Sequence, residues 1–204
     1  NNVGKSGGII FNPEPPINGL SSSQPNSSKE FVEIVDEIKS GDIELLLLKD
    51  ADLYYGLPDS AGFKNDFANV PMIVSFGNMM DDSTSIADLV LPQNSLLEDW
   101  GTDVPLAGPG YQTVGFQQPV VRPFFESRGQ NLGTKGFAEV LMTTSQVMGV
   151  DLQLGGETYV DVLKNTAKEL YDLNRGDING SKYSSFTSFW NALLARGGWW
   201  DHNY

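Results

Sequence analysis

The chain has 204 residues, enough for one large domain or two small ones with a hydrophobic core. Its 13 lysines and arginines against 26 aspartates and glutamates give a net charge of −13, which argues against nucleic acid and anionic lipid as partners because both carry phosphates. The absence of cysteine excludes disulfides, thiolate zinc sites and iron–sulfur clusters ligated by this chain. No apolar run approaches the roughly 20 residues that a membrane span needs, so we expect no direct span.

Residues 1–26 are rich in Gly, Pro, Ser and Asn. Three prolines within them, Pro13, Pro15 and Pro16, oppose a helix, so we expect an extended arm with turns. The chain starts without a methionine or a signal peptide, and we therefore expect a mature product or an interior segment.

Residues 27–92 alternate between helix and strand patterns. Ser27 and Glu30 form a capping box at the start of a helix that ends at Gly41, and Asp59 can cap a shorter helix that carries two phenylalanines on one face. Three apolar runs predict strands of a parallel sheet: Ile43–Leu48, Val70–Ser75 and Leu89–Leu91. The unbroken run Leu89–Leu91 is of the kind that such a sheet buries on both faces. The alternation predicts an α/β domain over residues 27–133, with right-handed crossovers between the strands.

From Gly101 to Gly133, prolines and glycines separate short β-prone pieces such as Tyr111–Phe116, which indicates a long excursion within this domain. Residues 134–204 are expected to be helical and to pack on the α/β domain or on partners. Three amphipathic helices account for this segment: one capped by Thr134 and ended at Gly149, one at 157–174, and one from Phe186 to Gly197. The pair Trp199–Trp200 after the last helix is either a docking surface or part of a core.

The segment Gly4-Lys5-Ser6-Gly7-Gly8 matches two catalytic patterns. As Gly-x-Ser-x-Gly it is a nucleophile elbow, for which His202, the only histidine, completes the Ser…Asp…His order of α/β-hydrolases. As Gly-Lys-Ser it is the end of a phosphate-binding loop. Both motifs need a helix directly after them, and the residues that follow Gly8 are typical of an extended segment, which disfavours both interpretations.

Carboxylates follow the first two predicted strands, at the edge of a parallel sheet where ligands bind. Asp50 and Asp52 form one pair and Asp81 and Asp82 the other. Each pair is either a solvated acidic loop or a site for a ligand or a hard metal ion. With one histidine and no cysteine, a transition-metal site built from this chain alone is not expected.

The third predicted strand carries the pattern Ala87-Asp88-Leu89-Val90-Leu91-Pro92, followed by Glu98 and Gly101-Thr102. This pattern resembles the interior of the molybdopterin oxidoreductase family, in which an Ala-Asp-x-Val-Leu-Pro strand precedes a Glu and a Gly-Thr pair. Three further stretches agree with that family: Asn2–Gly8, Val70–Ser75 with Asp81 and Thr84, and Gln117–Pro123 with Arg128. Within the family, four stretches look most like the molybdopterin-like B subunits of alternative complex III: Phe11–Pro13, Trp100-Gly101 with Asp103–Pro105, Gly110-Tyr111 and Val114–Val121.

One departure from the family concerns the cofactor. Cofactor-binding members have a Gly-x-Asn-Pro turn where this chain has Asp50-Ala51-Asp52-Leu53, so two negative charges face what would be a pyrophosphate. The resemblance therefore implies a vestigial pterin crevice without catalytic or metal-ligating residues. Its expected members are Asp50, Asp52, Asp81, Asp88 and Glu98.

The resemblance implies a non-catalytic structural part of a respiratory or photosynthetic quinol:electron-acceptor oxidoreductase. It implies an interior segment of a larger subunit on the periplasmic side of the membrane, without cofactors of its own. The expected partners are subunits with iron–sulfur clusters and a multihaem cytochrome c. The alternative is a segment of an active molybdoenzyme such as a polysulfide or tetrathionate reductase, whose site would use loops 49–58, 76–82 and 92–103.

Overall fold

The computed structural model describes residues 3–5, 8–9, 16–17, 27–105, 110–123 and 133–203. The chain divides into two compact units that interleave along the sequence. One unit comprises Asn1–Gln24, Leu96–Val121 and Met142–Tyr204, and the other comprises Pro25–Ser95 and Arg122–Leu141. We call the first the antiparallel unit and the second the parallel unit, after the sheet that each contains.

Helix α1 (Ser28–Ser40) belongs to the parallel unit and begins at the predicted capping box. The Ser27 hydroxyl accepts from the backbone N–H of Glu30 at 3.3 Å, and the Glu30 carboxylate accepts from the N–H of Ser27 at 2.6 Å. Gly41 ends the helix with a φ of 79°, a left-handed conformation that favours glycine. Local sequence signals therefore determine both ends of α1.

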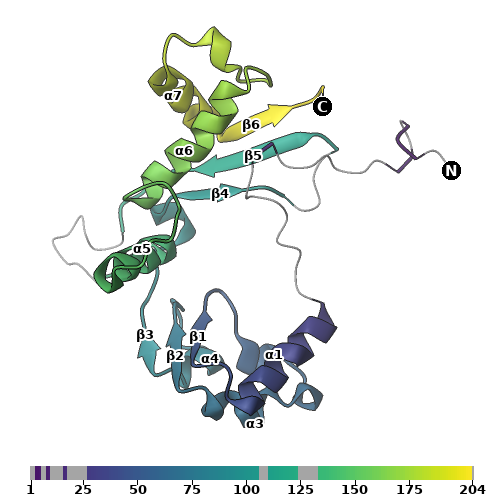
Figure 1. Cartoon of the computed structure of the whole chain (residues 1–204), viewed down its shortest axis with the longest axis vertical. Helices are drawn as coiled ribbons and strands as arrows, with labels where there is room; N and C mark the ends of the chain where they lie inside the picture. Colours follow the sequence, from purple (N-terminus) through teal and green to yellow (C-terminus); the bar gives the residue numbers. More distant parts are fainter. Residues whose placement is uncertain are drawn as a thin grey trace. The chain divides into compact units, whose positions relative to one another are not determined.

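Three strands form the parallel sheet, in the order β1 (Leu45–Leu48), β2 (Met72–Ser75) and β3 (Leu89–Val90). All of β1 pairs with β2, and the end of β2 pairs with β3 (Figure 1). Short helical segments connect the strands: α2 (Leu53–Gly56), η1 (Asp59–Ala61), α3 (Phe63–Asp66) and η2 (Phe67–Asn69) between β1 and β2, and α4 (Asp82–Ser85) between β2 and β3. The helix predicted from Asp59 is therefore divided into three shorter pieces.

The parallel sheet is packed on one face and partly exposed on the other. On the packed face, Leu48 and Ile73 join a core that α1 and the α3 region complete with Val35, Ile38, Phe63, Phe67 and Val70. The connection from β1 to β2 and the connection from β2 to β3 run across the sheet in the same direction. Right-handed crossovers that run in the same direction place their helical segments on the same face of the sheet. The opposite face buries Val74 of β2 but exposes 51% of Leu45 and 42% of Met72. Leu89 is 39% exposed on that face, so the prediction that the run Leu89–Leu91 is buried on both faces is wrong.

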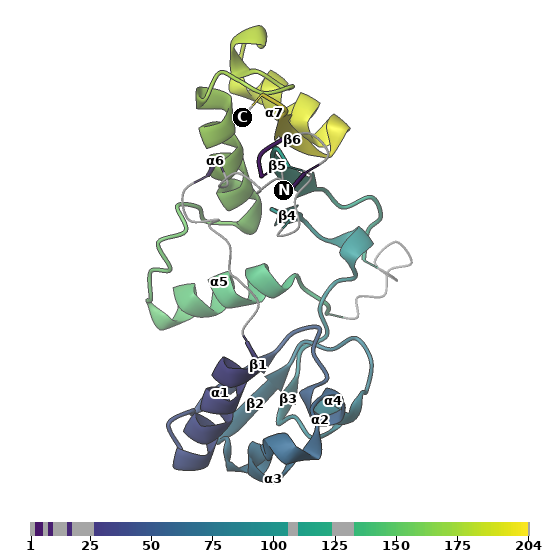
Figure 2. The same ribbon diagram turned by 90° about the vertical axis from the view of Figure 1, so that its right-hand side faces the viewer.

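The antiparallel unit contains β4 (Gly101–Asp103), β5 (Gln112–Gln117) and β6 (Gly198–Asp201), with β5 in the middle. Helices α6 (Tyr159–Asp172) and α7 (Phe186–Arg196) share a core with this sheet (Figure 2). The buried members of that core are Ile17, Val114, Phe116, Leu163, Ala167, Leu170, Ile178, Phe189, Trp190, Leu193 and Trp199. Of the two alternatives for the tryptophan pair, the structure therefore places Trp199 in a core.

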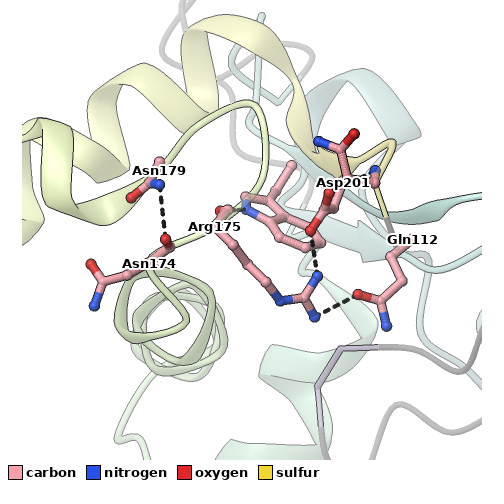
Figure 3. A network of polar contacts seen from close by, with 7 residues as sticks. Gln112, Asn174, Arg175, Asn179 and Asp201 are labelled. Atoms are coloured by element: carbon pink, nitrogen blue, oxygen red, sulfur yellow. Dashed lines mark hydrogen bonds and ion pairs between the residues drawn. The ribbon is translucent and has the colours of Figure 1, made fainter.

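A polar network joins β5, β6 and the segment after α6 (Figure 3). The guanidinium of Arg175 donates to the buried carboxylate of Asp201 at 2.5 Å and to the side-chain oxygen of Gln112 at 2.7 Å. The same guanidinium lies 5.4 Å from the ring of Trp199, whose indole N–H donates to the carbonyl of Arg175 at 3.2 Å. Arg175 thus holds the end of the chain against the middle strand of the sheet.

The remaining elements are η3 (Leu96–Glu98), η5 (Gly180–Lys182) and α5 (Phe137–Met148). Among the helices of the described ranges, none has both the length and the apolar character that a bilayer crossing requires.

The predicted α/β class with a parallel sheet, flanking helices and a helix-rich C-terminal part is confirmed. Helix α5 begins at Phe137 rather than at Thr134, and β6 was not expected in the segment 134–204. The structural units interleave, whereas the sequence predicted consecutive segments 1–26, 27–133 and 134–204. Most of the predicted arm lies outside the described residues.

Candidate functional site

The carboxyl ends of the parallel strands lie side by side and define the candidate site. The N–H of Phe76, directly after β2, donates to Leu48 of β1 at 2.8 Å, and the N–H of Leu91, directly after β3, donates to Ser75 of β2 at 2.8 Å. The loops that follow the strands therefore start from a common edge, where ligands bind in open α/β sheets.

Asp52 connects the loop after β1 to the helix after β2. Its Oδ1 accepts from the backbone N–H of Ser83 at 3.1 Å, from the Ser83 hydroxyl at 2.7 Å and from the N–H of Tyr55 at 3.3 Å. The Ser83 oxygen in turn accepts from the N–H of Tyr54 at 2.8 Å. The hydroxyl of Ser83 is the main reason that the pKa of Asp52 lies below its ordinary value, so this carboxylate is ionised at neutral pH.

Asp50 connects the loops after β1 and β3. It adopts a left-handed backbone conformation with a φ of 51°, at the position where cofactor-binding relatives have the glycine of their turn. Its carboxylate pairs with Lys49 and accepts from the side-chain amide of Gln93 at 2.6 Å. Lys49 Nζ also lies 5.8 Å from the ring centroid of Phe137. Lys49 is thus already engaged by a carboxylate of the chain.

Asp81 caps α4 by accepting from the N–H of Thr84 at 2.7 Å. The buried hydroxyl of Thr84 is 2.8 Å from that of Ser75 at the end of β2. Gly77 passes so close to this pair that an added Cβ would lie 2.6 Å from Thr84 Oγ1. The loop after β2 is therefore packed against α4 without free space at this point.

The other two predicted residues lie elsewhere. Asp88 precedes β3 and accepts from the N–H of Ile73 at 2.8 Å, so it stands at the start of the strand rather than at its carboxyl end. Glu98 ends η3 and belongs to the antiparallel unit. The structure brings together Asp52 with Ser83, and Asp50 with Gln93. Within the parallel unit, Asp88 lies at the opposite end of the strands from both pairs.

The residues at this edge do not fit the pyrophosphate of a pterin nucleotide. A phosphate at such an edge is usually held by free N–H groups at a helix N-terminus. Here the N–H groups of Tyr55, Ser83 and Thr84 already donate to Asp52 or Asp81. The two capping carboxylates would also repel a second anion.

The other candidates bring no catalytic groups together among the residues that the structure describes. In the Gly-x-Ser-x-Gly segment, Gly4 donates to Ile9 at 2.7 Å and Gly8 to Lys5 at 2.9 Å, while Ser6 lies outside the described residues. The ring centroid of His202 is 4.3 Å from that of Tyr111. Within the described ranges, no three His, Asp or Glu side chains gather in a way that could hold a metal ion.

Sequence reasoning missed Ser83 and Gln93, which organise the site. Both bond to aspartates in the loop after β1, across 31 residues for Ser83 and 43 for Gln93. The only local signal was the Asp81-x-x-Thr84 spacing, which is typical of a helix N-cap and marks the start of the helix that carries Ser83.

Comparison with known proteins gives two matches. Residues 15–132 match the family model described as molybdopterin oxidoreductase, and this range includes all three strands of the parallel sheet. One curated relative is the menaquinone reductase, molybdopterin-binding-like subunit, of Nitratidesulfovibrio vulgaris strain Hildenborough, 30% identical over 122 residues. The aligned region covers 60% of this chain and 16% of that relative, so the chain corresponds to a small part of the relative's length.

Proposed function

Since the chain belongs to the molybdopterin oxidoreductase family, we propose that it is a non-catalytic structural part of a membrane-bound quinol:electron-acceptor oxidoreductase. The observation that carries the proposal is the capping of α2 and α4 by Asp52 and Asp81 at the edge where a pterin nucleotide would bind. The carboxylates use the local hydrogen-bond donors to join the loops to each other. The edge then stabilises the domain and is unsuited to an anionic cofactor.

The family and its quinone-linked member support the second half of the proposal. The relative is named a menaquinone reductase subunit, and the word "like" in its name qualifies its molybdopterin binding. We propose the same setting for this chain: a complex related to alternative complex III, on the periplasmic side of the membrane. Its neighbours would carry the iron–sulfur clusters and the haems of a multihaem cytochrome c, and this chain would hold them in place.

Metal and nucleotide analysis of the purified native complex tests the proposal. The expected result is molybdenum far below one atom per copy of this chain and no guanine nucleotide after denaturation, with iron present from the partners. A molybdoenzyme purified and denatured in parallel serves as the control for cofactor loss. Stoichiometric molybdenum with nucleotide would overturn the proposal and favour an active molybdoenzyme subunit.

A further inference from the structure

A hollow of about 540 Å³ lies between the second half of α5 and the start of α6, within the antiparallel unit. It is lined by Met142, Ser145, Gln146 and Gly149–Glu157, and it is partly open to solvent. Its volume is in the range of sites that hold a small ligand or an anchoring side chain of a partner.

Exposed apolar side chains line this hollow or flank it in the chain. Val147 and Met148, in the last turn of α5, are 84% and 71% exposed, and Val150, Leu152 and Leu154 are between 43% and 50% exposed. Single exposed apolar residues are ordinary, but Val150, Leu152 and Leu154 together line one hollow and give it an exposed apolar surface. Such a surface around a hollow is typical of a binding site for another protein.

The walls of the hollow are held in place before anything binds. The side-chain amide of Gln146 donates to the carbonyl of Glu157 at 3.1 Å, which connects α5 to the residue before the cap of α6. Asn165 of α6 donates to the carbonyl of Gly155, and the N–H of Val150 donates to Ser145 at 2.9 Å. A preformed site loses little conformational freedom on binding, which favours affinity.

The charge of the lining selects the partner. Among the lining residues, all of which the structure describes, Asp151 and Glu157 carry carboxylates and none carries a positive charge. The carboxylate of Asp151 accepts from the backbone N–H of Gln153 at 2.8 Å, and no lysine, arginine or histidine is among the residues that line the hollow. A lysine or arginine beside apolar side chains would complement this lining.

We propose that the hollow at the α5–α6 connection docks a segment of a neighbouring subunit that carries apolar side chains next to lysine or arginine. The apolar side chains would contact Val150, Leu152 and Leu154, and the cation would face Asp151 and Glu157. The inference rests on the proposed role within a complex, and it identifies the surface through which one partner is held.

Photo-crosslinking in the assembled complex tests this inference. A benzophenone amino acid at Leu152 should crosslink to a peptide of another subunit that contains apolar residues beside lysine or arginine, as read by mass spectrometry. The same group at Tyr55, which is 76% exposed in the parallel unit, is the control and should not give that product. Crosslinks only within this polypeptide, or no crosslinks, would overturn the docking site. If the complex is intact in that experiment, the proposed function is not contradicted by the same result.

Substitution separates the apolar from the electrostatic part of the surface. Leu152→Asp should reduce the amount of that partner retained during purification by at least about tenfold. Asp151→Lys should also reduce the retained amount, and its effect should be larger at low salt concentration, where charge repulsion is screened less. Val120→Asp, a change at another exposed apolar residue of the antiparallel unit, is the control for added charge. Retention equal to that of the unsubstituted complex in both hollow variants, with unchanged thermal unfolding, would contradict the proposal.

Discussion

The carboxylate of Asp52 accepts two hydrogen bonds from Ser83, one from its hydroxyl at 2.7 Å and one from its backbone N–H at 3.1 Å. These bonds connect the loop after β1 to α4 across 31 residues of sequence. At the same edge, Asp50 accepts from Gln93 and thereby connects the loops after β1 and β3. Aspartates at the proposed vestigial crevice therefore act as structural links between loops.

Ser83→Ala is expected to destabilise the protein. The hydroxyl is buried, donates to Asp52 and accepts from the N–H of Tyr54, so its removal leaves that N–H without this partner. The expected loss is about 1–3 kcal/mol in the free energy of unfolding. Urea unfolding measures it, with Ser85→Ala on the exposed side of α4 as a control that should change stability by less than about 0.5 kcal/mol. Equal effects of the two substitutions would show that the Ser83 hydroxyl does not link the loops.

Asp52 should make stability depend on pH in acid. Its pKa is lowered in the folded state, mainly by the Ser83 hydroxyl, so the folded protein binds this proton less readily than the unfolded chain does. The carboxylate therefore contributes stability above the unfolded-state pKa of about 3.9, and this contribution is lost as pH falls through the lower, folded-state pKa. Asp52→Asn is expected to be less stable than the unsubstituted protein at pH 7, with the difference shrinking below about pH 4.

Urea unfolding at a series of pH values measures this difference. In a Ser83→Ala background the effect of Asp52→Asn should be smaller, because the main cause of the lowered pKa is absent. A difference that grows as pH falls would have the wrong sign and would contradict the assignment.

Arg175→Ala is expected to destabilise the antiparallel unit. The substitution leaves the buried carboxylate of Asp201 without its guanidinium partner, although the N–H of Asn203 still donates to it at 2.9 Å. Because the Arg175 side chain is 31% exposed, we expect about 2 kcal/mol rather than the larger cost of a fully buried pair. Arg196→Ala is the matched control, since its ion pair with Asp177 is 3.6 Å long and exposed, and about 1 kcal/mol or less is expected.

Features encoded by neighbouring residues could be predicted from the sequence, and features that join distant residues could not. The capping box of α1 lies within four residues, and the apolar runs of β1 and β2 are continuous, so both are visible locally. Strand β6 is four residues long and forms because Trp199 pairs with Val114, 85 positions earlier. No local sequence pattern predicts a pairing between residues so far apart, which is why the segment 134–204 was expected to be helical only.

The candidate site follows the same division. Asp50, Asp52 and Asp81 could be found because they follow predicted strands. The replacement of the family's Gly-x-Asn-Pro turn by Asp50–Leu53 is also visible in the sequence. Their roles depend on Gln93, Ser83 and Thr84, and only the last of these is close enough in sequence to Asp81 to be anticipated. The partial exposure of one face of the parallel sheet could not be predicted either, because an apolar run has the same sequence pattern whether one face or both faces are covered.

Gly176→Ala should be among the most destabilising single substitutions. Gly176 has a φ of 88°, which disfavours a side chain, and an added Cβ would lie 2.5 Å from the indole of Trp199. Trp199 is fully buried and cannot move aside without disturbing the core, so we expect a loss of about 3–5 kcal/mol from the combined backbone strain and overlap. Gly41→Ala is the control, because Gly41 has a similar φ of 79° with no atom within 4 Å of the added Cβ, and about 1–2 kcal/mol is expected from the backbone alone. Urea unfolding measures the free energy of unfolding of both variants, and the difference between their losses is the cost of the overlap with Trp199. Equal losses of stability would mean that the segment after α6 can shift away from the core.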